Sequence, residues 1–291
     1  MKKKAFDLLL KTISKVTGKK VLYINKNYVN YKNLAVKSKY GFWYCGNVFD
    51  QTDIAYGVAS VGDIESEDTD LVFKILKKLK SDYVFYDIGA NTGWYSMLAA
   101  TVSQNSKVIS FEPISEHIEP LNQSIYLNRF DSRVAVQPVA LSNTEGEADI
   151  LLAGTGSSLE KNFLEKNEGV RKVKLEMLDN LVKNNNIPLP DFIKIDVEGH
   201  EYNVLLGAKE TISKSLPILF VEIACTLKNL GRDFINPNYK DIFSLMDSMG
   251  YKPYTLKTKQ LVKYSTDEIQ DGVQMYLFLH NTEHKEVLDL V

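Results

Sequence analysis

The sequence predicts an α/β protein with a doubly wound, mostly parallel sheet, preceded by an α+β extension at the N-terminus. From residue 83 onward, short apolar runs of strand length alternate with stretches of helical period. A glycine-rich turn follows the first of these strands, and an acidic residue ends the second. With 291 residues, 44% of them hydrophobic and 25% charged, the chain is long enough to bury the core that such a sheet needs.

The first 67 residues differ in charge from the rest and predict an extension packed on a main domain of residues 68–291. Residues 1–40 carry eleven lysines and one acid, whereas residues 41–73 contain seven acids and no lysine or arginine. Apolar residues recur at helical spacing over 6–16, which predicts a short basic amphipathic helix. Residues 20–60 are rich in Tyr, Val, Ile and Asn without helical period and predict short strands and turns.

The elements of the main domain follow from apolar period and turn residues. A helix is expected over 68–80, where acids lead and lysines trail, as the helix dipole favours. Further helices are expected at 94–103, 116–129, along the apolar face that runs from Val204 to Ile212, and at 238–249. At least seven strands are expected, from the candidates 83–88, 108–112, 133–141, 148–153, 192–197, 218–223, 251–256 and 273–280.

Composition also excludes several classes of protein. No apolar run approaches the roughly 18 residues that span a bilayer, and Asp7 and Lys11 interrupt the apolar start of the chain. The two cysteines, Cys45 and Cys225, are too few for a disulfide framework and lack the spacing of metal ligands. We therefore expect a cytoplasmic protein without a transmembrane segment. The sequence indicates no oligomeric state.

The turn DIGANTG (87–93) after the first strand indicates a nucleoside site. Its small residues let the backbone bend tightly and bring peptide N–H groups close to a ligand. It differs from the dinucleotide pattern G-x-G-x-x-G, because Asn91 stands at the middle position and the last glycine comes four residues after the first. Glu112 ends the second strand, where a carboxylate can accept hydrogen bonds from both ribose hydroxyls. The alternative is a plain tight turn and a solvated strand end.

Four segments, in order, resemble the FkbM-like methyltransferases that use S-adenosylmethionine. They are FYDIGANTGWYS (85–96), VISFEPISE (108–116), VQPVALSNTEGEADI (136–150) and DFIKIDVEGHEYNVLLGA (191–208) with FVEIA (220–224). The resemblance covers about residues 68–224, and it is specific because DIGANTG and IKIDVEGHE occur together. It implies a seven-stranded, Rossmann-like methyltransferase sheet and S-adenosylmethionine as the cofactor.

The resemblance also implies a cofactor site. Asp87, Gly89, Ala90, Asn91 and Gly93 would surround the methionine portion, Glu112 would bind the ribose and Pro113 would lie beside the adenine. Ala140 and Ser142 would contact the adenine edge, and Asp196 would face the sulfonium. All of these positions follow the carboxyl ends of strands, where ligands of such sheets bind.

The segment DVEGHE (196–201) predicts the catalytic residues, because packing so many ionisable groups without a function is unfavourable. Methyl transfer needs an aligned acceptor and a group that removes its proton. We expect His200 as that base, with Asp196 and Glu198 beside it, although Glu198 or Glu222 could also be the base. His200 facing solvent at a helix start is the alternative. A divalent metal held by Asp196, Glu198 and Glu222 is conceivable, but without a further clear ligand we expect none.

These observations predict a methyltransferase that modifies a hydroxyl of a sugar, a glycan or another small metabolite. The segment NPNY (236–239) only partly matches the Asn-Pro-Pro-aromatic loop of enzymes that methylate amino nitrogens, and it stands after the wrong strand. An RNA methyltransferase using the basic N-terminus is an alternative, but the first 128 residues contain no arginine. A non-catalytic S-adenosylmethionine-binding module is a third possibility, which the intact DVEGHE segment opposes.

Overall fold

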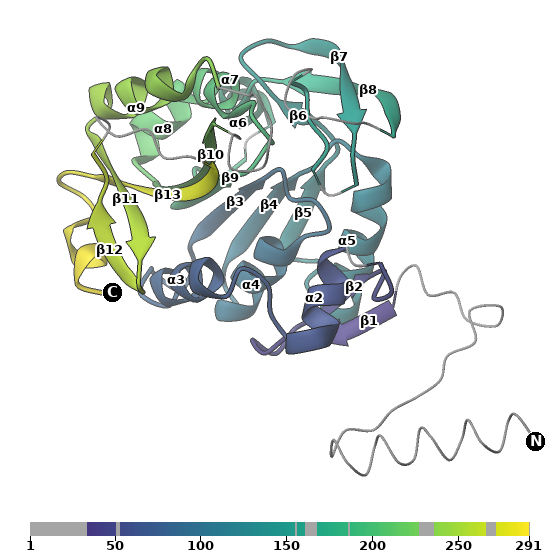
Figure 1. The fold of residues 1–291 in the computed structure, drawn as a ribbon. Coiled ribbons are helices and arrows are strands. Elements are labelled where there is room, and N and C mark those ends of the chain that lie inside the picture. Colours follow the sequence, from purple (N-terminus) through teal and green to yellow (C-terminus); the bar gives the residue numbers. More distant parts are fainter. Residues whose placement is uncertain are drawn as a thin grey trace, which may run out of the picture.

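The centre of the molecule is an eight-stranded sheet with strand order β12-β11-β13-β10-β9-β3-β4-β5 (Figure 1). This computed structural model describes residues 34–50, 53–154, 156–160, 168–185, 187–226, 236–265 and 272–290. The parallel part consists of β5 (Val134–Gln137), β4 (Lys107–Phe111), β3 (Val84–Ile88), β9 (Phe192–Ile195) and β10 (Ile218–Thr226). The antiparallel part consists of β13 (Gly272–His280), β11 (Tyr251–Lys257) and β12 (Gln260–Lys263). The predicted α/β fold is confirmed, with β12 as an eighth strand that the prediction lacked.

Strand order places a crevice at the carboxyl ends of β3 and β9. The chain runs outward from β3 to β4 and β5 and then returns to form β9 on the other side of β3. The connections that leave β3 and β9 therefore diverge, and ligands of doubly wound sheets bind where this happens. The turn at 89–93 and the turn after β9 both lie at this position.

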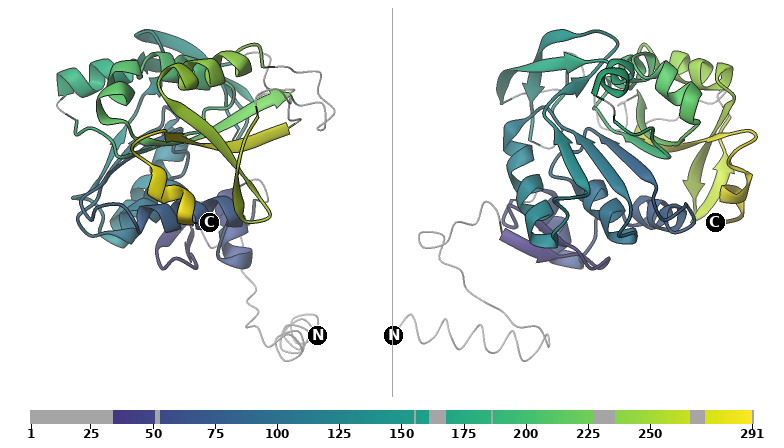
Figure 2. Two further views of the ribbon diagram at one scale, coloured as in Figure 1. Left: turned by 90° about the vertical axis from the view of Figure 1, so that its left-hand side faces the viewer. Right: turned by 180° about the vertical axis from the view of Figure 1, so that it is seen from behind.

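Helices cover both faces of the sheet (Figures 1 and 2). One layer contains α3 (Ser66–Leu76), α4 (Trp94–Val102) and α5 (Ser115–Asn128). The other contains α6 (Leu178–Asn185), α7 (Glu201–Leu206), α8 (Lys209–Ser215) and α9 (Tyr239–Ser248). Strand residues alternate between the two cores: Phe85 and Phe192 pack under the first layer, and Tyr86 and Ile193 under the second. A 3₁₀ helix, η2 (Lys285–Leu290), follows β13.

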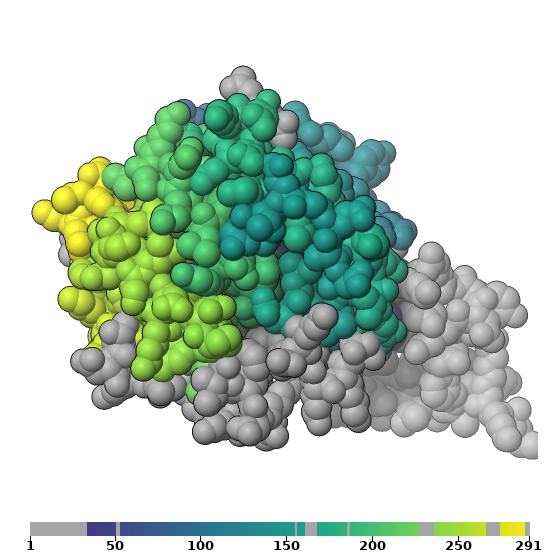
Figure 3. All heavy atoms as spheres, turned by 90° about the horizontal axis from the view of Figure 1, so that it is seen from above, coloured from purple at the N-terminus to yellow at the C-terminus, as the bar shows by residue number. Residues whose placement is uncertain are grey.

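A separate three-stranded sheet, in the order β6-β8-β7, lies beside the second layer of helices. Its strands are β6 (Ala140–Leu141), β8 (Gly169–Glu176) and β7 (Gly146–Leu152). Seen from above, this teal region and the green region of residues 200–226 and 236–250 lie against each other on the surface (Figure 3). The sequence analysis missed β8, because its basic residues hide the alternation that leaves Val173 buried between exposed lysines.

The described part of the N-terminal region, from residue 34 onward, contributes a hairpin and the helix α2 (Ile54–Val61). The hairpin, β1 (Leu34–Lys37) and β2 (Trp43–Gly46), agrees with the predicted strands and packs on α5, where the backbone N–H of Cys45 donates to Ser124 Oγ at 2.9 Å. The prediction of strands was wrong for residues 54–60, which form α2 (Ile54–Val61). Asp53 caps this helix and Gly62 ends it, and burial of its apolar side outweighs the weak helix propensity of valine and glycine. The predicted helix over 6–16 lies outside the described residues.

One predicted helix is interrupted. The apolar face from Val204 to Ile212 is divided between α7 and α8 at Gly207. A Cβ at Gly207 would lie 2.0 Å from the carbonyl oxygen of Ser142, so this glycine allows close contact with the segment that follows β6. None of the described helices combines the length and hydropathy needed to cross a membrane.

Candidate active site

A cavity opens at the carboxyl ends of β3, β4 and β9, beside the middle of β10, where the sequence predicts the site. Predicted positions that line it are Gly89, Ala90, Asn91, Glu112, Pro113, Ala140, Asp196, Glu198 and His200. Three predicted positions are not among the residues that line it, namely Asp87, Gly93 and Ser142. The N-terminal region also contributes to the wall through Ile54, Ile64 and Glu65.

The turn from Gly89 to Gly93 is held by hydrogen bonds within the protein. Gly89, Asn91 and Gly93 have positive φ angles of 74°, 51° and 88°, which explains the glycines at two of the three positions. The N–H groups of Gly89 and Ala90 both donate to the carbonyl oxygen of Phe111 at 3.0 Å. The expectation that these N–H groups face a ligand was therefore wrong, since they join the turn to β4.

Gly89 is required by contact between two backbone segments. A Cβ at this position would lie 1.8 Å from the carbonyl oxygen of Asp196. The turns that follow β3 and β9 are therefore packed backbone against backbone, and a side chain at residue 89 would separate them. Gly93 has a comparable role against α5, since its Cβ would approach the side chain of Leu121 to 2.2 Å.

Asp87 lies beneath the cavity and supports it from the sheet. Its side chain is only 1% exposed and accepts a hydrogen bond from Ser96 Oγ at 2.5 Å. It stands directly opposite Lys194 on the neighbouring strand β9. Burial raises the pKa of Asp87, and the positive charge of Lys194 opposes this rise. Asp87 therefore stabilises the buried lysine, a role that differs from the cofactor contact expected for it.

Glu112 connects the two ends of the predicted nucleoside site. Its carboxylate accepts the N–H of Asn91 at 2.8 Å and the N–H of Ile114 at 2.9 Å, and it lies 3.2 Å from Nδ1 of His117. Burial lowers the pKa of His117, but the hydrogen bond and charge of Glu112 outweigh this effect and raise it overall. Each carboxylate oxygen can accept more than one hydrogen bond, so these contacts leave acceptor capacity on the cavity side.

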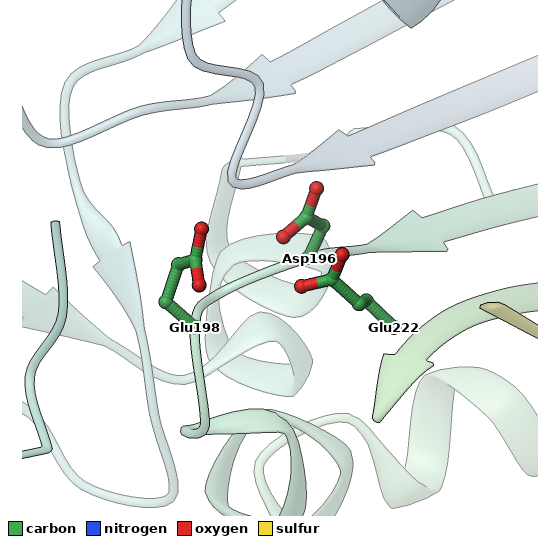
Figure 4. A group of neighbouring side chains, drawn as sticks. All are labelled: Asp196, Glu198 and Glu222. Carbon is green, nitrogen blue, oxygen red and sulfur yellow. The ribbon is translucent and has the colours of Figure 1, made fainter. Parts of the chain in front are cut away.

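Three carboxylates converge where β9 ends beside the middle of β10 (Figure 4). Asp196, Glu198 and Glu222 each place an oxygen within 4.8 Å of the others. Burial is the largest cause that raises the pKa of Glu222 well above its usual value. The negative charges of Asp196 and Glu198 raise it further. The oxygen atoms of this group could hold either a shared proton or a divalent cation.

Lys194 balances part of this negative charge. Its Nζ lies 2.8 Å from Oδ2 of Asp196, and its side chain is 5% exposed. Burial alone lowers the pKa of Lys194, but the charges of Asp196 and Asp87 outweigh burial, so the ammonium stays protonated. The ammonium also lies 5.2 Å from the ring centre of Tyr95.

The turn after β9 has an uncommon backbone. Glu198 and Gly199 have successive positive φ angles of 55° and 101°. The N–H of Gly199 donates to Oε1 of Glu201 at 2.9 Å. Burial raises the pKa of Glu201 to about 7. The Glu198 side chain lines the cavity at this turn.

Both nitrogens of the His200 ring lie against side chains of the protein. Nε2 is 3.0 Å from Ser142 Oγ, and Nδ1 is 2.7 Å from Oε1 of Glu160. The side chain is 11% exposed, so the alternative of a solvent-facing histidine was wrong. His200 also lines the cavity, and both of its ring nitrogens have a side-chain partner in this arrangement.

Comparison with known proteins identifies the family of the chain. Residues 87–253 match the family described as the methyltransferase FkbM domain. The chain belongs to this family. S-adenosylmethionine is the cofactor of the FkbM methyltransferases, as the sequence analysis expected.

Two curated proteins resemble this FkbM methyltransferase in sequence. Hexuronic acid methyltransferase AglP from Haloferax volcanii is 28% identical over 163 residues, which are 56% of this chain and 64% of AglP. AMB antimetabolite synthetase AmbE from Pseudomonas aeruginosa is 24% identical over 184 residues, which are 50% of this chain and 8% of AmbE. The chain therefore spans less than two thirds of the length of either relative.

Solved structures of low sequence identity were also found. Methyltransferase FkbM from Methylobacillus flagellatus is 18% identical, with a TM-score of 0.43, covering 69% of this chain and 44% of that chain. TYW2 of P. horikoshii, solved in complex with MeSAdo, is 14% identical, with a TM-score of 0.44, covering 92% of this chain and 80% of that chain.

The charges of the cavity fit this FkbM methyltransferase's cofactor. The acidic residues that line it are Glu65, Glu112, Asp196, Glu198 and Glu222. Among the described residues that line the cavity, Lys194 is the one lysine, and it is already paired with Asp196. This excess of negative charge suits a ligand that carries a sulfonium cation.

Sequence reasoning missed several residues of the site. Lys194 could have been found, because a lysine inside the apolar strand FIKI must have a buried partner. Glu65 and Glu160 show no such signal. They belong to connecting segments, and only the fold brings them to the cavity and to His200.

Glu112→Ala is expected to weaken S-adenosylmethionine binding by about 1–3 kcal/mol, the scale for losing hydrogen bonds to a charged group. The alanine would remove acceptors for both the ribose and the N–H of Asn91. Glu112→Gln should lose less, since its amide keeps one oxygen acceptor. Calorimetry with the three proteins measures the difference. Equal affinities of wild type and Glu112→Ala would show that Glu112 does not contact the cofactor.

Proposed function

We propose that this chain transfers the methyl group of S-adenosylmethionine to a hydroxyl of a sugar, a glycan or another small metabolite. The observation that carries the proposal is the convergence of Asp196, Glu198 and Glu222 at the end of the parallel strands. A hydroxyl becomes a strong nucleophile as it loses its proton, and a carboxylate within hydrogen-bond reach can accept that proton. Neighbouring carboxylates can also bind adjacent hydroxyls of a sugar ring.

We assign a separate role in the reaction to each residue of the site. S-adenosylmethionine, when bound, supplies an electrophilic methyl group on a good leaving group. Glu112 holds the ribose, and Lys194 orients Asp196 through their ion pair. Glu222, whose pKa is raised by burial, accepts the proton of the acceptor hydroxyl, because its carboxylate lines the cavity beside those of Asp196 and Glu198. Glu198 raises that pKa further and orients the acceptor.

Glu222 takes the role that the sequence analysis gave first to His200. The sequence left Glu198 and Glu222 open as alternatives, and the two occupied nitrogens of His200 support them. We propose a reaction without a metal, since Lys194 already supplies a positive charge beside Asp196.

Two further observations support a sugar acceptor and oppose an amino-nitrogen acceptor. The AglP relative is named as a hexuronic acid methyltransferase, and so acts on a sugar acid. The segment at 236–239, the candidate for an amino-nitrogen loop, leads into α9, and the N–H of Asn236 donates to the carbonyl oxygen of Cys225 at 3.0 Å. Asn236 is 1% exposed and is not among the residues that line the cavity.

Incubation with methyl-labelled S-adenosylmethionine tests this proposal. Separate glycan, small-molecule, lipid, RNA and protein fractions serve as acceptors. Label is expected in the glycan or small-molecule fraction. Label in the RNA fraction alone would favour the RNA methyltransferase that the basic N-terminus suggested. Cofactor binding without label in any fraction would favour the non-catalytic binding module.

A further inference from the structure

Residues 156–160, which we call the strap, contact the turn that presents Glu198. Ser158 Oγ donates to the carbonyl oxygen of Glu198 at 2.6 Å. Oε1 of Glu160 lies 2.7 Å from Nδ1 of His200, two residues further along the turn. The Glu198 side chain passes over Gly156, where an added Cβ would lie 3.4 Å from its Oε1. The strap therefore contacts the backbone, the side chain and the end of the turn.

The strap is itself fixed to the small sheet. Ser158 exchanges two backbone hydrogen bonds with Leu151 of β7, at 2.8 and 3.0 Å. The same serine is fully buried, and its Oγ accepts the N–H of Glu160 at 2.9 Å. On the other side of the His200 ring, Nε2 meets Ser142 Oγ, which follows β6. The His200 ring is thus held between two segments that are anchored outside the turn.

The turn needs support of this kind because its backbone is unfavourable. Glu198 has a positive φ angle, which a residue with a Cβ adopts only where surrounding contacts hold it. From inside the fold, Glu201 binds the N–H of Gly199. From outside, the strap binds the carbonyl oxygen of Glu198 and the ring of His200. Without the outer contacts, the Glu198 carboxylate would lose its fixed position beside Glu222.

We propose that Glu160 and Ser158 are positioning residues for methyl transfer. They act through His200 and the backbone of Glu198 to hold the Glu198 carboxylate against Glu222. His200 is then part of this support, and the proton passes to the carboxylates. This inference rests on the proposed function, because it assigns the strap a role in the same reaction.

Steady-state kinetics of two substitutions at residue 160 test the proposal. Glu160→Ala should lower kcat about tenfold or more, the scale for a small misplacement of a catalytic group, while the KM for S-adenosylmethionine stays within about twofold. Glu160→Gln should keep most of the activity, since its amide oxygen can still accept from Nδ1–H of His200. Glu147→Ala, an exposed acid on β7 of the same sheet, is the matched control. A kcat of Glu160→Ala equal to that of the control would overturn the proposal.

A second measurement does not depend on finding an acceptor. Hydrogen exchange of the backbone N–H groups at 198–201 should become faster in Glu160→Ala and in Ser158→Ala, and should be unchanged in Glu160→Gln and Glu147→Ala. If the wild-type protein transferred no methyl group to any acceptor, the proposed function would fail, yet this measurement would still report on the strap. Exchange unchanged in both alanine variants would show that the strap does not hold the turn.

Discussion

Glu222→Gln is expected to lower turnover by about 10²–10⁴-fold, the usual contribution of a positioned general base. The amide keeps the shape of the side chain but cannot take a proton from the acceptor. S-adenosylmethionine affinity should change by no more than a few-fold, because Asp196 and Glu112 remain. Initial rates with labelled cofactor, together with calorimetric affinities, separate the two effects. Glu147→Gln, whose parent side chain is exposed on β7, serves as the control for a lost charge.

Two other results would contradict this role for Glu222. If Glu222→Gln kept full turnover and His200→Ala lowered kcat without changing KM, His200 would be the general base. Loss of wild-type activity after dialysis against a chelator, with recovery on adding Mg²⁺ or Mn²⁺, would show that Glu222 and its neighbours hold a metal. We expect the chelator to leave the rate unchanged.

Gly89→Ala is expected to abolish S-adenosylmethionine binding. The added Cβ would lie 1.8 Å from the carbonyl oxygen of Asp196, and a backbone atom held by β9 cannot move aside as a flexible side chain can. The turns after β3 and β9 would separate. Ala90 and Asn91 would then move away from the Asp196 carboxylate. Calorimetry measures the loss, and circular dichroism shows whether the sheet still forms.

Gly41→Ala is the matched control for Gly89→Ala. Gly41 also has a positive φ angle, 100°, but an added Cβ would meet no atom within 4 Å. Both variants therefore carry backbone strain, and only Gly89→Ala adds the collision. If both proteins bound the cofactor equally, the two turns would not need the close contact that the structure shows.

Much of the fold could be predicted because its strongest signals are local. Buried strands such as VFYDI and ILFVEI are apolar runs bounded by turn residues, and both form central strands of the sheet. The missed elements lack such signals. Strand β8 carries alternating basic residues, and helix α2 depends on Ala55 and Val58 being buried against other parts of the molecule. Tertiary contacts decide these cases, and a single sequence does not display them.

The site was predictable in position and less so in detail. Glu112, Asp196 and Glu198 were found because acids at the ends of buried strands have few structural roles. The sequence could not predict that both ring nitrogens of His200 have side-chain partners. These partners, Ser142 and Glu160, are 58 and 40 residues away along the chain. The reason for Gly89 was also hidden, because it depends on how closely β3 and β9 end beside each other.

The central claim is tested most directly by determining whether the transferred methyl group is held in an ether or in an ester bond. Labelled product from a glycan or sugar acceptor is treated with mild alkali, which cleaves a methyl ester but leaves a methyl ether intact. The account predicts that the label stays on the product after this treatment, because a hydroxyl oxygen received the methyl group. Release of the label as methanol would contradict it, since the acceptor would then be a carboxylate and the carboxylates of the site would have no proton to remove.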